Sequence, residues 1–493
     1  MNFAREVVDA AAPGQLALLE LARDGTRREW SFGEISERAA RMAGALRGRG
    51  VDRGDVVMTL IGNRPEWVLT MLACFRIGAV VLPCTEQLRR KDLRLRIDTV
   101  APTLIVSDER NRQELEAALA AGDTPIPVAY VPDELLFASA PVPAVDLSSD
   151  DPCLLTFTSG TAGEPKAVVH AQRYLDGQRV QAEHWLGARP GDLVWCTAAS
   201  GWSKSARNVF IAPWLSGASA LLHDARFDPN ERLELLGRER VNLLCMAPTE
   251  YRVIAKRATL RPLAHLRGMV AAGEALNPAV LRAWKEATGL EIRDGYGQTE
   301  TGQTTGTPLD TDARPGSMGR ALPGTGLTIV DGELTVDPPS VPTFFLGYLG
   351  EHVRRGIDGV WSVQDRRDGG PWHTGDKVIE DDDGWLYFEG RADDVIVSAG
   401  YRIGPFEVES ALVAHPAVAE AAAVAAPDEE RGAVVRAVVV LRGEYMPSPE
   451  LVRELQDHVK RETAPYKYPR IVEFAEELPK TASGKIKRAQ LRG

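Results

Sequence analysis

The chain has 493 residues, of which 44% are hydrophobic and 26% charged, a composition typical of a globular protein with room for several domains. The formal net charge of −11 argues against nucleic-acid binding, because proteins that bind a phosphate backbone carry a basic surface. The five cysteines are scattered singly with no CxxC pair, which predicts buried free thiols in a reducing compartment rather than disulfides or a zinc site.

The chain begins with "MNFAREVVDAAAPG", which lacks both a cationic start and a long apolar core. We therefore expect no secretion signal. The most apolar segment, 67–83, is interrupted by Arg76 and is too short to span a bilayer. The sequence predicts a cytoplasmic protein without integral membrane contact, and it leaves the oligomeric state open.

The first helix is predicted to follow Ser31, which stands three residues before Glu34 in the spacing of a capping box. Apolar residues then recur at helical period over 35–46. Next come a β-branched run over 55–61, an apolar helix over 67–77, and short strands over 79–83 and 103–108. The basic run 89–96 alternates Arg with Leu and is expected to form an exposed helix face.

Short strands continue to alternate with helices further along the chain, which indicates layered α/β architecture. The apolar runs lie within the segments 192–198, 241–247, 266–276 and 290–300, and small or polar residues follow each of them. Ligand sites of open α/β sheets form at the carboxyl ends of strands, so we look for a site at these strand exits.

The pattern changes near residue 390, where compact helices and a strand pair joined by "PDEERG" replace the long alternation. The fold class predicted is α/β, with a large N-terminal domain over 1–391 made of layered α/β subdomains. Residues 392–493 form a separate, small α+β domain of ordinary size.

Several familiar sites are excluded. The sequence contains no GxxxxGK[ST] phosphate loop, no HExxH pair and no GxSxG elbow. Isolated histidines such as His170, His184 and His223 are expected to be surface residues or satisfied core residues.

Four other stretches carry residues suited to a nucleotide. "TSGTAGEPK" (158–166) combines glycines, hydroxyls and a lysine that can surround phosphate. "GYGQTE" (295–300) offers a hydroxyl for phosphate and a carboxylate for Mg²⁺. "HTGD" (373–376) places a carboxylate where it can accept from ribose hydroxyls, and "PKTASGK" (479–485) ends on a lysine.

Together and in this order, the four stretches resemble those of the adenylate-forming enzymes, which include acyl-CoA synthetases, luciferases and peptide-synthetase adenylation domains. The resemblance covers nearly the whole chain and is closest to the medium-chain acyl-CoA synthetases. It is carried further by "RADDVIVSAGYRIGPFEVESAL" (391–412), "TAPYKYPRIVEF" (463–474) and "ELPKTASGK" (477–485). It implies that the small C-terminal domain is a mobile lid.

The resemblance also implies a role for individual residues. Lys485, Thr299 and Glu300 are the implied catalytic residues, with Glu300 holding Mg²⁺; Asp393 is the implied hinge, and Gly400 and Tyr401 line the tunnel for coenzyme A (CoA). The implied ATP-binding residues are Thr158, Ser159, Gly160, Thr161, Gly163, Lys166, Gly273, Glu274, Ala275, Asp294, Gly295, Tyr296, Thr299, Asp376, Arg391 and Arg402.

The acyl pocket is expected next to "GWSKSARNVF" (201–210). Its candidate walls, by position in the family, are Trp202, Ser203, Ala206, Asn208 and Gly297. Acetate-specific relatives carry Trp at the last of these positions, so glycine there predicts a larger acid, medium-chain, branched or aromatic. Lys204 could lie near a second carboxylate of the substrate, but an exposed position is the one expected for it.

The predicted function is that of an ATP-dependent, AMP-forming acid:CoA ligase that acts through an acyl-adenylate. Its substrates would be a small carboxylic acid, ATP and CoA, with Mg²⁺ as the metal. Two alternatives remain open at this point: a ligase that loads the acyl group onto a carrier-protein phosphopantetheine, and a non-catalytic nucleotide-binding regulator. The sequence does not name the acid.

Overall fold

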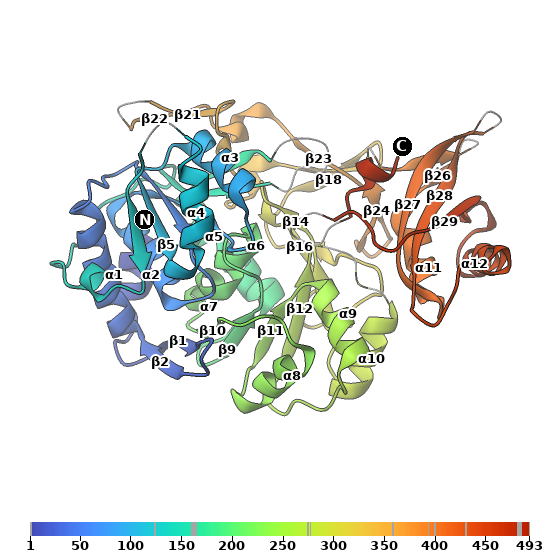
Figure 1. Ribbon diagram of the computed structural model, residues 1–493, viewed down its shortest axis with the longest axis horizontal. Coiled ribbons are helices and arrows are strands. Elements are labelled where there is room, and N and C mark those ends of the chain that lie inside the picture. Colours follow the sequence, from blue (N-terminus) through green and yellow to red (C-terminus); the bar gives the residue numbers. More distant parts are fainter. Residues whose placement is uncertain are drawn as a thin grey trace.

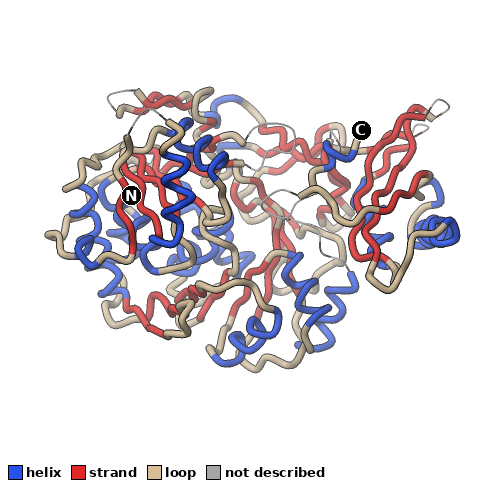
Figure 2. Tube along the Cα trace, viewed as in Figure 1, coloured by secondary structure: helices blue, strands red, loops and turns tan. Residues whose placement is uncertain are grey.

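We describe the fold from a computed structural model, which covers residues 2–122, 125–158, 165–273, 276, 278–356, 359–392, 394–398, 401–428, 431–480 and 486–492. Among the described residues, three sheets of four or more strands build the large domain, and a three-stranded sheet, β27-β28-β29, is the larger sheet of the C-terminal domain. Figures 1 and 2 show their arrangement. Strands and helices alternate along most of the first 300 residues, as the sequence predicts.

The first sheet has seven strands in the order β20-β8-β7-β4-β3-β5-β6. Its centre, from β7 to β6, is parallel, while β8 and β20 pair antiparallel at one edge. The strands are β3 (Val56–Leu60), β4 (Val80–Cys84), β5 (Leu104–Asp108), β6 (Val128–Val131), β7 (Pro152–Phe157), β8 (Ala167–Ala171) and β20 (Gly347–Tyr348).

The second sheet also has seven strands, in the order β13-β12-β11-β9-β10-β1-β2. All neighbours are parallel except the edge pair β1 and β2. The strands are β1 (Leu16–Leu21), β2 (Arg27–Ser31), β9 (Leu193–Cys196), β10 (Ser219–His223), β11 (Leu243–Met246), β12 (Gly268–Ala272) and β13 (Ile292–Gly295).

Helices cover both faces of the two sheets, so the large domain has five layers. The central core lies between the sheets, around side chains such as Trp67 and Trp214, and two further cores lie on the outer faces. The central helices are α1 (Phe32–Arg47), α2 (Pro65–Ile77), α5 (Arg173–Gln181) and α7 (Ala212–Leu215). The outer helices are α3 (Arg90–Val100) and α4 (Arg112–Leu119) on the first sheet, and α8 (Pro229–Arg238), α9 (Pro248–Arg257) and α10 (Pro278–Thr288) on the second.

Local sequence signals account for several of these boundaries. Ser31 accepts a hydrogen bond from the Glu34 backbone N–H at 3.2 Å, and the Glu34 carboxylate accepts from the Ser31 N–H at 2.9 Å. The predicted capping box is therefore confirmed at the start of α1. Helix α2 is buried on nearly every side, which explains why its sequence is apolar throughout rather than amphipathic.

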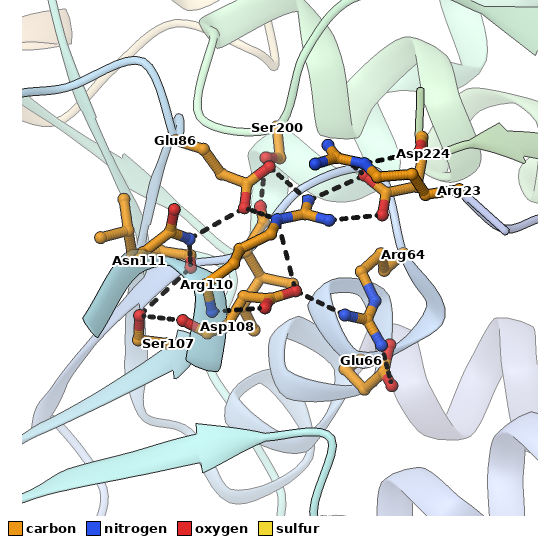
Figure 3. Close-up of polar contacts among 12 residues, drawn as sticks. Arg23, Arg64, Glu66, Glu86, Ser107, Asp108, Arg110, Asn111, Ser200 and Asp224 are labelled. Carbon is orange, nitrogen blue, oxygen red and sulfur yellow. Dashed lines mark hydrogen bonds and ion pairs between the residues drawn. The ribbon is translucent and has the colours of Figure 1, made fainter. Parts of the chain in front are cut away.

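A polar network joins the carboxyl ends of the two large sheets (Figure 3). The Arg110 guanidinium, just after β5, binds Asp224 after β10 at 2.6 Å and also binds Glu86 after β4. Arg64 pairs with Asp108 beside it. Each of these charges therefore has an opposite charge as its partner.

A smaller antiparallel sheet follows the second large sheet, in the order β18-β19-β23-β24. Its strands are β18 (Leu327–Val330), β19 (Glu333–Val336), β23 (Trp372–Glu380) and β24 (Leu386–Arg391). Short hairpins flank it: β14 (Gly297–Gln298) with β15 (Gly302–Gln303), β16 (Thr305–Gly306) with β17 (Arg320–Ala321), and β21 (Val353–Arg355) with β22 (Trp361–Val363).

The C-terminal domain lies at one end of the molecule, coloured orange to red in Figure 1. Its strands and helices enclose a core of their own, and the predicted fold class, a large layered α/β domain with a small α+β domain, is confirmed. The elements are β25 (Ile396–Ser398), β26 (Tyr401–Ile403), α11 (Pro405–Ala414), β27 (Val418–Asp428), β28 (Gly432–Leu441), α12 (Pro449–Glu462) and β29 (Ile471–Phe474). The boundary itself, at 391/392, stays a prediction.

Candidate active site

Asp376 is the centre of a buried hydrogen-bonded cluster. Its carboxylate accepts from the Tyr296 hydroxyl, from Gln298 Nε2 at 2.8 Å and from Arg391 Nη1 at 3.2 Å. Asp376 and Arg391 are brought together because they pair directly across β23 and β24. Burial raises the pKa of Asp376, while the Tyr296 hydroxyl and Arg391 oppose that rise. A carboxylate has about four lone-pair sites, so this one retains room for a further donor such as a ribose hydroxyl.

Glu300 lies in a second cluster with Tyr348 and Lys166. The Tyr348 hydroxyl donates to Glu300 Oε1 at 2.8 Å. Lys166 Nζ lies 4.8 Å from the centre of the Tyr348 ring and 2.8 Å from Glu351 Oε1. Burial raises the pKa of Glu300, and the hydrogen bond from Tyr348 opposes that rise. The structure thus brings the predicted loop lysine and the predicted metal ligand onto the same tyrosine.

Trp372 links the two clusters. Its indole N–H donates to Gln298 Oε1 at 3.0 Å, and its ring packs edge-on to Phe345, with ring centres 5.3 Å apart. Phe345 in turn packs against Tyr348, and its backbone N–H donates to the Glu300 carbonyl at 2.8 Å. The "GYGQTE" and "HTGD" stretches therefore lie side by side.

The glycine-rich loop leaves the first sheet between β7 and β8. At its base, the Thr158 N–H donates to the Lys166 carbonyl at 2.9 Å, and the Lys166 N–H donates to Thr158 Oγ1 at 3.2 Å. These bonds extend the β7–β8 hairpin by one pair. The predicted residues Ser159, Gly160, Thr161 and Gly163 lie outside the described residues.

The predicted adenine side lies at the carboxyl ends of β12 and β13. Gly273 follows β12 with φ of +104°, a conformation that favours glycine. At the end of β13, Asp294 Oδ1 accepts from the Gly295 N–H at 2.8 Å, and burial raises the pKa of Asp294 to about 8. Asp294 also lines a small cavity of about 10 Å³. Glu274 and Ala275 lie outside the described residues.

The predicted acyl wall starts at a segment that is fixed to the first sheet. The Ser200 N–H donates to Asn63 Oδ1 at 2.9 Å, and a Cβ at Gly201 would lie 2.3 Å from the Thr85 nitrogen. A short helix then follows, α6 (Ser203–Ala206), continued by η5 (Arg207–Ile211). Of the predicted walls, Trp202 and Ser203 are half-buried, whereas Ala206 and Asn208 are buried.

Lys204 corrects one expectation from the sequence. It is half-buried, and its Nζ donates to the Ala272 carbonyl at 3.2 Å, because α6 points it at the end of β12. The prediction that Lys204 is exposed is therefore wrong. His170 is fully buried, beside the backbone of Thr299.

The backbone of a neighbouring strand explains why residue 297 is glycine. A Cβ at this position would lie 1.9 Å from the Gly302 carbonyl oxygen across the β14–β15 hairpin. The close approach of the two backbones therefore requires glycine at this position. For that reason the glycine does not directly indicate the volume of the acyl pocket. The predicted size of the acyl group stays a prediction.

The remaining predicted residues fall in the C-terminal domain or beside it. Tyr401 is exposed and stacks on Tyr466 with ring centres 4.3 Å apart. Arg402 belongs to β26, but its side chain lies outside the described residues, as do Asp393, Gly400 and Lys485. Their predicted roles stay predictions.

Sequence reasoning missed Tyr348, Trp372 and Gln298 as members of the site. Gln298 lies inside the "GYGQTE" stretch and could have been found there. The two aromatic residues belong to no recognisable motif, because only the packing of the β20 and β23 segments brings them to the site.

Comparison with known proteins identifies the family. The AMP-binding enzyme family model matches residues 6–355, and the AMP-binding enzyme C-terminal domain model matches residues 407–485. The chain belongs to the AMP-binding enzyme family. The predicted adenylate-forming superfamily is confirmed, and with it the predicted enzyme class, an AMP-forming acid:CoA ligase.

Individual relatives span the whole chain. An uncharacterized acyl-CoA ligase of Bacillus subtilis (strain 168), YtcI, is 38% identical over 519 residues, which cover 100% of this chain and 95% of the relative. The human mitochondrial acyl-coenzyme A synthetase ACSM4 is also 38% identical, over 100% of this chain and 90% of its own length.

Solved structures of the same fold agree. The Brucella canis acyl-CoA synthetase is 33% identical, with a TM-score of 0.74 over 100% of this chain and 94% of that one. The anthranilate CoA ligase AuaEII, solved with anthranoyl-AMP, is 29% identical, with a TM-score of 0.86 over 99% of this chain and 96% of that one. Among the described residues, no helix is long and apolar enough to cross a bilayer.

Proposed function

We propose that this chain converts a carboxylic acid larger than acetate to its CoA thioester through an acyl-adenylate, using the residues assembled around Asp376 and Glu300. The observation that carries the proposal is the joining of these two carboxylates by Trp372, Gln298 and Tyr348. One cluster is suited to ribose and the other to charge at the phosphates.

In the first half-reaction, an oxygen of the substrate carboxylate attacks the α-phosphorus of ATP and pyrophosphate leaves. Both reactants are anions, so the attack needs nearby positive charge and a fixed orientation. Lys166, held at the base of the loop, supplies charge on the phosphate side. We propose that Thr299 donates to the α-phosphate and that Lys485 approaches the same oxygens.

Mg²⁺ fits the Glu300 position. Mg²⁺ in phosphate-transfer sites takes oxygen ligands and is commonly held by one or two carboxylates together with substrate phosphates. Glu300 offers a carboxylate that the hydrogen bond from the Tyr348 hydroxyl orients. No group of three potential metal-ligating side chains occurs among the described residues, so in our proposal the phosphates provide the other ligands. Bound there, the metal would neutralise developing phosphate charge.

The second half-reaction requires the C-terminal domain to present CoA, whose sulfur attacks the acyl carbonyl as AMP leaves. Arg391 is bonded to Asp376 and to the Thr374 carbonyl in the large domain. Asp394, three residues later, is paired with Arg488 and Arg492 near the C-terminus. The side chains of Arg391 and Asp394 are thus bonded to different parts of the chain, which supports Asp393, between them in the sequence, as the hinge.

Acid-dependent exchange of labelled pyrophosphate into ATP tests the first half-reaction, and CoA-dependent AMP release tests the second. We expect both with an acid larger than acetate. If exchange occurs but the acyl group is transferred only to the phosphopantetheine of a carrier protein, the acceptor is that carrier protein and not CoA. No exchange with any acid of a broad panel would reject the enzymatic proposal in favour of a regulator.

We further infer a reducing, cytoplasmic setting, supported by the five free and buried cysteines at 74, 84, 153, 196 and 245. The acidic net charge of −11 supports small-molecule rather than nucleic-acid partners.

A further inference from the structure

Arg207 is a buried cation for which the described residues provide no ion pair. Three arginines of the described residues are at most 6% exposed: Arg76 at 4%, Arg207 at 4% and Arg232 at 6%. Arg76 pairs with Asp9, and Arg232 lies 3.6 Å from Glu250. Arg207 has no ion pair within the described ranges, and its Nε and Nη1 have no hydrogen-bond partner there.

An unpaired buried charge is strongly unfavourable, so a buried arginine without a counter-ion among its neighbours is suited to bind an anion. Arg207 begins η5, directly after the candidate acyl wall Ala206 and beside Asn208. It therefore stands on the same helical segment as the residues expected to line the acyl pocket.

The neighbours of Arg207 place it close to the reacting groups. Burial lowers the pKa of His170 to about 3, the Arg207 charge lowers it further, and the Thr299 backbone opposes the change. His170 is thus a neutral residue between Arg207 and the residue proposed to meet the α-phosphate. The phenol of Tyr174, a neutral partner, also lies beside Arg207, whose charge and hydrogen bond lower the pKa of Tyr174 against the larger, raising effect of burial.

Lys204 adds a second cation on the same side of the helix, since residues three apart share a helix face. Its Nζ donates to the Ala272 carbonyl and lies 3.6 Å from where a Cβ on Gly273 would stand. The charges of both Lys204 and Arg207 act on Cys245, at the carboxyl end of β11. The nearby Asp294 does not offset them at neutral pH, since burial raises its pKa to about 8.

We propose that the acyl pocket recognises an acid with a second carboxylate, which pairs with Arg207 while the first carboxylate reacts with ATP. The inference rests on the proposed function. A guanidinium is weakly hydrated and suits carboxylate geometry, so it is the cation expected at a buried anion site. The substrate supplies the counter-ion that the described residues lack, and an apolar acyl chain of equal length leaves Arg207 without one.

CoA-dependent AMP release with matched acids tests the proposal in the wild-type enzyme. The pairs are succinate with butanoate, glutarate with pentanoate, and adipate with hexanoate, which differ only in the distal group. We expect a kcat/KM at least about tenfold higher for the dicarboxylate in one or more pairs. A preference for the monocarboxylate in all three pairs would overturn the inference while leaving the proposed function intact, whereas no activity with any acid would reject the proposed function itself.

Variants at residue 207 identify the group responsible. Arg207→Met should lower kcat/KM for the preferred dicarboxylate on the order of 100-fold, the loss typical of truncating one member of a buried charge pair, and should leave or raise the value for its matched monocarboxylate. Arg207→Lys should retain part of the preference. An equal loss with both acids would place Arg207 at the reacting carboxylate and overturn the proposal. Should Arg207→Met fail to fold, the ratio of the wild-type kcat/KM values for the dicarboxylate and its matched monocarboxylate decides.

Discussion

Two arginines of the large domain show opposite arrangements. Arg110 has a side chain 24% exposed and is bonded to two carboxylates, Glu86 and Asp224 (Figure 3). Arg207 is only 4% exposed and has no carboxylate partner among the described residues. The arginine with less access to water is the one without an anion, the reverse of what folding stability alone would favour.

The contrast separates a structural site from a binding site. The Arg110 network joins the carboxyl ends of both large sheets, so its charges stabilise the position of one sheet against the other. Arg207 makes no comparable stabilising ion pair among the described residues. Such an arrangement is typical of binding sites, where a protein gives up some stability for function. Four predictions test this difference, and tryptophan fluorescence is a suitable probe, since all ten tryptophans lie before residue 391.

The largest expected effect on stability is that of Arg110→Met. It leaves Glu86 and Asp224 without their shared cation, so the free energy of unfolding of the large domain should fall by about 3 kcal/mol. Urea unfolding followed by tryptophan fluorescence measures this. Arg112→Met is the matched control, because Arg112 pairs with Glu109 and Glu116 at the surface and should shift the midpoint far less. Equal shifts would show that the Arg110 network has no special role.

The next effect concerns acid sensitivity. Burial lowers the pKa of His170 to about 3 in the folded protein, whereas its pKa in the unfolded chain is near 6.5. As the pH falls, the unfolded chain therefore binds a proton at His170 before the folded protein does. The free energy of unfolding consequently falls as the pH drops below about 6.5. Between pH 7.5 and 5.5 this costs about 1.4 kcal/mol. His170→Phe should remove that part of the pH dependence. An unchanged slope of unfolding free energy against pH would mean that His170 is not held neutral.

A smaller effect of opposite sign is expected for Arg207→Met. Removing an uncompensated buried charge should raise the free energy of unfolding by about 1 kcal/mol, whereas the same substitution at Arg110 lowers it. The two variants are compared under identical urea conditions without substrate. A loss of stability at Arg207 as large as that at Arg110 would remove the contrast.

The smallest effect is that of Tyr348→Phe, which deletes the one hydroxyl that orients Glu300. A single hydrogen bond to a charged group contributes about 1.5 kcal/mol or slightly more, and part of it is recovered from water. We expect the KM for Mg-ATP to rise roughly threefold, with little change in the KM for the acid. A larger rise for the acid would place Glu300 on the acyl side.

Much of this architecture could be predicted from the sequence because the signals are local. The Ser31–Glu34 cap and the small residues at the strand ends, such as Gly273 and Gly295, lie within a few positions of what they determine. The pairing of Asp376 with Arg391 depends on strand register, which short motifs do not specify.

The rest depends on contacts between distant segments. Tyr348 reaches Glu300, 48 residues away in the chain, and no local pattern indicates that contact. Arg207 and Lys204 stand at helical spacing, which in a sequence is typical of a solvated face. Only the burial of η5 between the sheets shows that Arg207 is enclosed.

Ligand-linked thermal stability measures directly whether a substrate carboxylate completes the Arg207 site. The wild-type enzyme is heated with a non-reactive ATP analogue and either the best dicarboxylate or its matched monocarboxylate. We predict a higher Tm with the dicarboxylate for the wild type and equal Tm values for Arg207→Met, since a ligand stabilises only the state that binds it. Equal shifts by both acids in the wild type, or a preserved difference in Arg207→Met, would contradict the account.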